Sequence, residues 1–236
     1  MITTLFFRTW HIIRHEKLLW GLYFIFFTLS EQWTLAAQAL GQAQSLWQWA
    51  AFLILFRWLF AVATQTVTVV LVKRTASETP ESHPWWRAIL TSWVQTLPFV
   101  ALSAALMWPL RNVAFSTSTP TGKQATLLIA LTLTSLLAEW VPIVTTVDQS
   151  GMGKTYKRLF GWIFKRAFVI LRMLVMIIVV GFFTIALAAI AGTIPVLGRA
   201  FFVPAIMAAG YGCTYVLATE TYRLTRTGGS LVDIQV

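Results

Sequence analysis

Residues 167–191 read AFVILRMLVMIIVVGFFTIALAAIA, and this stretch decides the fold class. Arg172 is the only charged residue in it. A helix of that length measures roughly 37 Å, which is enough to cross the roughly 30 Å hydrocarbon core of a bilayer. An apolar run this long predicts a membrane-spanning helix rather than the buried helix of a soluble protein.

Five further apolar stretches accompany this one, and each is long enough to cross a bilayer. Of the 236 residues, 58% are hydrophobic and 11% are charged, and the mean hydropathy is +0.73. A soluble domain could not cover that much apolar surface. We therefore expect an all-α polytopic membrane protein that forms one helical-bundle domain over residues 1–236. The six predicted transmembrane spans are 18–40, 46–72, 88–110, 124–147, 167–191 and 200–220.

Lysine and arginine are concentrated on alternate links between these spans. Of the 18, thirteen lie on the side that also holds both chain ends. Two lie inside predicted spans, and only Arg111, Lys123 and Arg199 lie on the opposite side. Because cytoplasmic links carry the excess of Lys and Arg in membrane proteins, this pattern predicts that both termini are cytoplasmic.

Two amphipathic segments are predicted on the cytoplasmic side. In residues 1–17, Phe6, Trp10 and Ile13 recur at helical spacing opposite basic side chains, which predicts an interfacial helix before the first span. A signal peptide is the competing interpretation of this segment. The link 148–166 becomes basic and aromatic, which predicts a second interfacial helix before span five. The basic residues that we expect to bind anionic lipids there are Lys154, Lys157, Arg158, Lys165 and Arg166.

The charge balance and the scarcity of metal ligands exclude several classes of function. The net charge of +10 would suggest nucleic acid on a soluble protein, but the basic residues flank apolar spans, so we expect anionic lipids and no nucleic acid as partners. Cys213 is the only cysteine, and the three histidines lie outside the spans. We expect no metal, no cofactor and no catalytic residues, and therefore no enzyme.

Two ionisable residues lie deep within predicted spans. Arg57 is roughly 17 Å from the outer end of span two, and Glu139 is roughly 12 Å from the inner end of span four, which places both at nearly the same depth. Because an ionisable group at membrane depth is energetically costly, we expect Arg57 and Glu139 to pair across a contact between spans two and four.

Other polar side chains share the faces of these two residues. Gln65 lies with Arg57 on one face of span two, and Thr132 and Ser135 lie with Glu139 on one face of span four. Two interpretations remain open. The set is either a static polar clasp inside the bundle or the lining of a path for a solute or proton.

Small residues recur at four-residue spacing in spans five and six. Ala188 and Gly192 form one such pair, and Ala208 and Gly212 form another. Small residues at this spacing let helix backbones approach closely in lipid, so we expect spans five and six to pack on each other there. Glu220, at the inner end of span six, is interpreted as an ordinary interfacial charge.

The run WVPIV (140–144), followed by Asp148, Gly151 and YKRLFGW (156–162), resembles a widespread six-helix prokaryotic membrane family. That family is similar to the membrane domain attached to some glycerophosphodiester phosphodiesterases. The resemblance implies a multi-pass protein of the prokaryotic plasma (inner) membrane. It implies no hydrolase activity, because these residues do not include the phosphodiesterase domain, and it suggests no catalytic residues.

The sequence therefore favours a non-enzymatic role. We expect an accessory or structural subunit of a membrane assembly, with membrane lipids and other membrane proteins as partners. The alternative is a small-solute transporter or channel lined by the polar faces of spans two and four.

Overall fold

The structure is a computed structural model that describes residues 2–42, 47–75, 84–113, 122–149, 151–194 and 197–226. Every regular element in these ranges is a helix, which confirms the all-α fold class. The elements are α1 (Ile2–His15), α2 (Lys17–Gln42), α3 (Trp47–Thr75), α4 (Trp85–Val113), α5 (Gly122–Asp148), α6 (Met152–Lys165), α7 (Ala167–Ala191), the short π-helix η2 (Gly198–Phe202) and α8 (Val203–Thr225).

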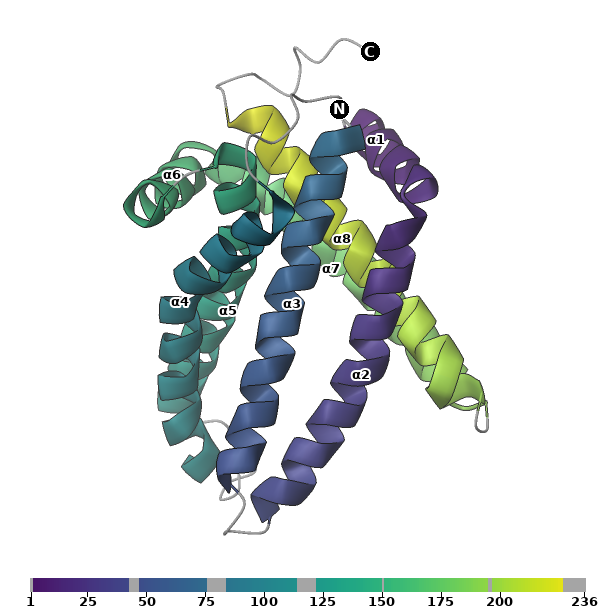
Figure 1. Cartoon of the computed structure of the whole chain (residues 1–236), viewed down its shortest axis with the longest axis vertical. Helices are drawn as coiled ribbons and strands as arrows, with labels where there is room; N and C mark the ends of the chain where they lie inside the picture. The colour runs from purple at the N-terminus through teal and green to yellow at the C-terminus, as the bar shows by residue number, and fades with distance from the viewer. Residues whose placement is uncertain are drawn as a thin grey trace.

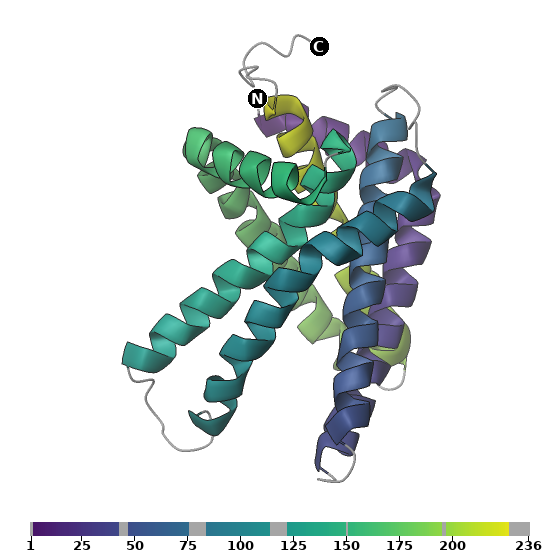
Figure 2. The same cartoon turned by 60° about the vertical axis from the view of Figure 1, so that its left-hand side comes forward.

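The long helices form three antiparallel hairpins. The hairpins α2–α3 and α4–α5 lie next to each other, and the α7–α8 hairpin crosses them obliquely (Figure 1). Helices α1 and α6 lie across the same end of the molecule, where α3 and α5 end (Figures 1 and 2). Both amphipathic segments predicted from the sequence are therefore helices, and both are placed at one end of the bundle.

Helix α8 is the central element of the fold. It packs against α1, α2, α3, α5 and α7. Its side chains from Tyr215 to Tyr222 are all buried. Tyr23 of α2, Val69 of α3 and Val144 of α5 are completely or almost completely buried in the same core. The best-packed part of the molecule is therefore the half that lies beneath α1 and α6.

Among the described residues, three helical segments are long and apolar enough to cross a membrane. They are Phe52–Thr75, Ala167–Ala191 and Gly198–Thr225, and they correspond to predicted spans two, five and six. In α7 the buried residues are only Met173, Thr184 and Ala191. Predicted spans one, three and four coincide with helices α2, α4 and α5, and their crossing of a membrane stays a prediction.

Helix α1 packs one face against the bundle, and the predicted apolar stripe lies only partly in that contact. Trp10 is 55% exposed, whereas Leu5, Thr9 and Ile12 are buried together with Ile13. The reason is that α1 packs sideways against α8, so the inward stripe is the one that faces this neighbour. The side chain of Phe6 lies outside the described residues.

The small residues of α8 pack against two neighbouring helices, α7 and α2, rather than against α7 alone. The predicted packing of spans five and six is confirmed, since α7 and α8 are in extensive contact. Gly210 faces α7, where an added Cβ would overlap the side chain of Thr184. Gly212 instead faces α2, and its Cβ would lie 3.2 Å from the ring of Tyr23. The Ala208 and Gly212 pair was therefore assigned to the wrong neighbour.

The interpretation of Glu220 as an ordinary interfacial charge is wrong. Its side chain is 1% exposed, and its two oxygens accept hydrogen bonds from Arg223 at 2.8 and 2.9 Å. The inner end of α8 is enclosed by neighbouring helices, so this carboxylate is held as a buried ion pair.

Candidate functional site

Three helices meet through a chain of polar side chains, which we call the polar joint: Gln65 of α3, Tyr211 of α8 and Glu139 of α5. Gln65 Nε2 donates to the Tyr211 hydroxyl at 2.9 Å. The Tyr211 hydroxyl donates to Glu139 Oε1 at 3.1 Å. The next tyrosine on the same face of α8, Tyr215, donates to the backbone oxygen of Glu139 at 3.0 Å. The polar faces predicted for spans two and four are thus joined through a third helix.

Arg57 and Glu139 were expected to pair across a contact between spans two and four. Helices α3 and α5 do touch, as predicted. The carboxylate of Glu139, however, is held by Tyr211, and Arg57 is exposed. Gln65, the side chain of α3 that is linked to Glu139 through Tyr211, lies eight residues after Arg57, or roughly 12 Å along the helix axis. The pairing of Arg57 with Glu139 stays a prediction.

Thr132 and Ser135 were the remaining predicted members of the site. Thr132 is exposed, and the side chain of Ser135 lies outside the described residues. Tyr211 was not predicted. The signal for it is the four-residue spacing of Tyr211 and Tyr215, which places two hydroxyl groups on one face of an otherwise apolar helix.

The other polar groups of α3 near the joint are satisfied locally. Thr64 and Thr66 donate to the carbonyl oxygens of Phe60 and Val62, at 3.0 and 2.8 Å. The hydroxyl of Thr68 is 3.0 Å from that of Tyr23. Hydroxyl groups that bond to carbonyls of their own helix can be buried without water. The described polar face of α3 is therefore closely packed, which is typical of a clasp.

A cavity of about 210 Å³ lies beside Glu139, between α5, α7 and α8. Most of its lining is apolar, contributed by side chains such as Ile143, Ile177 and Met207. The carboxyl and hydroxyl side chains that line it are Glu139, Thr184, Tyr211, Thr214 and Tyr215, and the indole of Trp140 adds an N–H group. The carboxylate of Glu139 thus lies between the polar joint on one side and an apolar cavity on the other.

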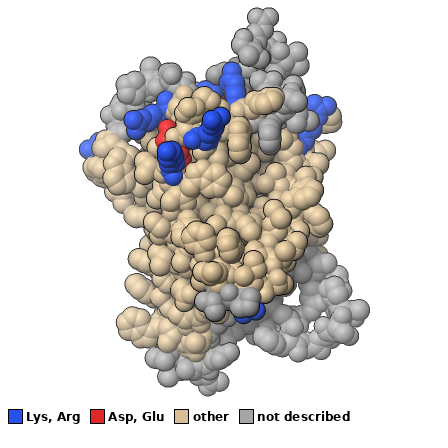
Figure 3. Space-filling view, turned by 90° about the vertical axis from the view of Figure 1, so that its right-hand side faces the viewer, with Lys and Arg blue, Asp and Glu red and all other residues tan. Residues whose placement is uncertain are grey.

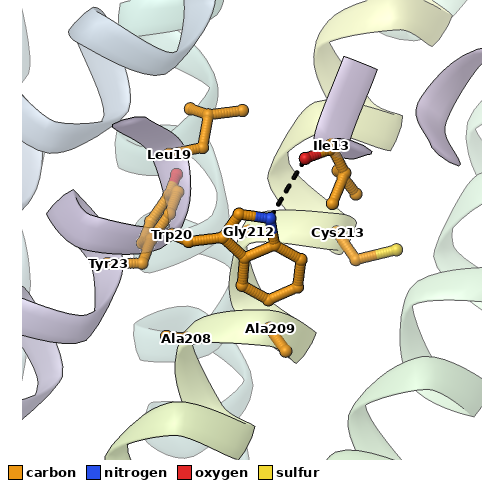
Figure 4. Close-up of a pocket in the computed structure, with 8 residues that line it drawn as sticks. All are labelled: Ile13, Leu19, Trp20, Tyr23, Ala208, Ala209, Gly212 and Cys213. Carbon is orange, nitrogen blue, oxygen red and sulfur yellow. Dashed lines mark hydrogen bonds between the residues drawn. The ribbon is translucent and has the colours of Figure 1, made fainter. Parts of the chain in front are cut away.

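A second cavity is too small to hold a ligand. It lies between α1, α2 and α8 and has a volume of only about 10 Å³ (Figure 4). The indole of Trp20 crosses it and donates to the backbone oxygen of Ile13 at 3.0 Å. Cys213 also lines this space. A volume of this size can accept about one water molecule, so we regard it as a packing defect.

Helix α6 is attached to the bundle through Asp148, at the end of α5. The carboxylate of Asp148 lies 3.2 Å from a guanidinium nitrogen of Arg158 on α6, and 3.2 Å from one of Arg226 after α8. It also accepts a hydrogen bond from Tyr222 at 2.8 Å. Trp162 of α6 donates to the Thr225 hydroxyl at 2.9 Å. Arg158, predicted to contact lipid, is thus partly engaged within the protein.

A second anchor of α6 is Tyr156, whose hydroxyl donates to the backbone oxygen of Gln95 on α4. Burial raises the pKa of the Tyr156 phenol, which therefore stays protonated and able to donate. The other basic residues predicted to bind lipid are solvent-facing or half-buried: Lys154, Lys157, Lys165 and Arg166. Most of the Lys and Arg visible on one face of the molecule gather at one end (Figure 3).

In the part of the chain that the structure describes, no group of three or more His, Cys, Asp and Glu side chains could hold a metal ion. Comparisons with known proteins add no assignment, because no family model, no curated protein and no solved structure matches this chain.

Proposed function

We propose that this chain is a non-enzymatic, multi-pass protein of a prokaryotic plasma membrane that acts as an accessory or structural subunit of a membrane assembly. Its three long apolar helices support a membrane location. The clustering of Lys and Arg on one end of the molecule, beside α1 and α6, supports a cytoplasmic location for that end and for both chain ends.

The observation that carries the proposal is the polar joint. A path for a solute needs polar groups that are free to contact that solute. Here the amide of Gln65 and the hydroxyl of Tyr211 are engaged with each other and with Glu139. Gln65 is only 5% exposed. This arrangement supports the clasp over the transporter, because the polar faces of α3 and α5 hold helices together rather than line an open route.

The outer surface of α7 supports a role within an assembly. Phe182, Ile178 and Ile190 are each more than 60% exposed, so this helix offers a long apolar face to lipid or to another transmembrane helix. The exposed lysines of α6 would add contact with anionic headgroups at the membrane surface.

Purification from native membranes at the endogenous expression level tests this proposal. We expect the protein to migrate with other chains in fixed stoichiometry, and expect purified vesicles that contain the protein alone to show no solute uptake above empty vesicles. An isolated protein that drives solute-dependent uptake, and that loses it on Glu139→Gln without loss of folded protein, would reverse the assignment in favour of transport.

A further inference from the structure

The cavity beside Glu139 is open to the side of the bundle. Its lining comes from side chains of α5, α7 and α8. Ile185 lines the cavity and is also 65% exposed, so the cavity reaches the outer surface of α7. An ideal Cβ on Gly181, which also lines it, would meet no atom within 4 Å. A molecule dissolved in the bilayer could therefore enter without crossing the polar joint.

The hydroxyl groups that line the cavity already donate hydrogen bonds to acceptors within the protein. Thr184 donates to the carbonyl oxygen of Val180, and Thr214 to that of Tyr211. As described above, the hydroxyls of Tyr211 and Tyr215 both donate to Glu139. These hydroxyls can accept further hydrogen bonds but cannot donate them to a ligand.

The Glu139 carboxylate is the strongest acceptor in the cavity lining. Its described hydrogen bond uses Oε1, which leaves Oε2 for a ligand in the cavity. An ionised carboxylate has about four lone-pair sites, whereas a protonated one keeps less accepting capacity. No Lys or Arg is found among the described residues that line the cavity. A hydrogen-bond donor carried by a ligand would therefore complement this carboxylate.

We infer that the cavity between α5, α7 and α8 binds a lipophilic small molecule that carries an O–H or N–H donor, and that this donor bonds to the carboxylate of Glu139. The apolar walls hold the hydrocarbon part of the ligand, and the ligand enters laterally from the bilayer. The inference does not depend on the accessory role, because a site of this kind could serve a subunit or a transporter equally.

The test uses the full chain in nanodiscs of phosphatidylethanolamine and phosphatidylglycerol. Three photoreactive probes share one alkyl-diazirine chain and end in an alcohol, a primary amine or a methyl group. After illumination, mass spectrometry maps the labelled peptides. We expect the alcohol or the amine to label peptides of α5, α7 and α8 around Glu139, and to exceed the methyl probe by about tenfold, which is the typical effect of a hydrogen bond to a charged group.

Gly181→Leu provides the decisive variant, because leucine would fill the cavity from a position with free space around the Cβ. We expect it to reduce the labelling at these peptides by about tenfold. Gly21→Leu is the matched control, since Gly21 also has free space around its Cβ but lies on α2, away from the cavity. It should leave the labelling unchanged. Size-exclusion chromatography shows whether both variants are folded.

Glu139→Gln separates the two possible donors. Glutamine keeps a carbonyl acceptor but loses the negative charge, so it should abolish preferential labelling by the amine and weaken that by the alcohol only partly. Abolished preference for the amine probe identifies an amine as the donor, and partly weakened labelling by the alcohol probe identifies an alcohol. Each of these two results supports the inference. Equal labelling by all three probes would mean that the cavity holds acyl chains only, and would overturn it. Unchanged labelling in folded Gly181→Leu would also overturn it.

Discussion

The hydroxyl group of Tyr211 takes part in two hydrogen bonds at once, as the acceptor from Gln65 and as the donor to Glu139. Each neighbour is a polar group on a different helix, so one atom of α8 joins α3 to α5. A comparable dependence on a single position occurs at Gly210, where the absence of a side chain lets α8 approach Thr184 of α7. Both features are tested by changes of one or two atoms.

Tyr211→Phe keeps the aromatic ring but removes the hydroxyl, and leaves Gln65 and Glu139 without this shared partner. We expect it to lower the free energy of unfolding by roughly 0.5–2 kcal/mol, the range for interhelical hydrogen bonds in membranes. Denaturant titration of the detergent-solubilised protein measures the loss. Tyr215→Phe is the matched control and should cost less, because it removes only a bond to a backbone oxygen. Equal losses would contradict the importance of the joint.

Gly210→Ala should destabilise the α7–α8 hairpin, because the new Cβ would overlap the side chain of Thr184 unless the helices separate. We expect a loss of about 1–3 kcal/mol, the usual cost of overpacking. Gly181→Ala, on the same hairpin, should be neutral or stabilising, because its Cβ has free space and alanine favours the helix. A lower melting temperature for Gly181→Ala than for Gly210→Ala would contradict the claim that the contact between Gly210 and Thr184 requires glycine.

The limits of prediction from the sequence are clear at these residues. Glu139 could be singled out because a lone acid in an apolar span must find a partner. Its partner, Tyr211, could not be predicted. Depth along a helix is uncertain by several residues, and a tyrosine in an apolar helix is equally typical of the core or of the interface. Gly210 and Gly212 differ in role only through the neighbours that the tertiary fold supplies.

Among the elements, α6 shows how a polar helix is attached to an apolar bundle. It was predictable, because basic and aromatic side chains alternate at helical spacing after the break at Gly151. Asp148 and Trp162, two of the residues that carry the family resemblance, both lie where α6 meets the ends of α5 and α8. The side of α6 that faces the protein could not be predicted without knowing where α8 ends.

The two arginines bound to Asp148 should differ in importance. Arg226 also donates to the carbonyl oxygen of Val147 at 2.9 Å, and its side chain is less exposed than that of Arg158. Because exposed ion pairs contribute little, we expect Arg226→Gln to accelerate amide hydrogen exchange in α6 more than Arg158→Gln does. The reverse order would show that α6 is held mainly through its own arginine.

The exposed lysines of α6 should bind anionic lipid. We expect the triple variant Lys154→Gln, Lys157→Gln and Lys165→Gln to retain less phosphatidylglycerol in native mass spectrometry, because each basic residue near an anionic surface contributes about 1 kcal/mol. Arginine at the same three positions keeps the charge and should keep the lipid. If the glutamine variant retains as much lipid as the arginine variant, α6 is not a headgroup site.

For the whole molecule, the prediction to test is the six-span topology. Six spans place the link after α4 and the link after α7 on the outer side, and α6 on the cytoplasmic side. In a Cys213→Ser background, we expect Ser118→Cys and Thr193→Cys to react with an impermeant maleimide in intact cells. Gly153→Cys should react only after the cells are opened. Labelling of Ser118→Cys only in opened cells would exclude the six-span topology.

The central position of α8 has a consequence for biogenesis. The ribosome makes this helix after all the helices that surround it, so the earlier hairpins enter the membrane while the space for α8 is still empty. Final compaction must therefore wait until translation has passed residue 225, and chains that stop earlier would expose polar side chains such as Glu139 to quality-control proteases of the membrane.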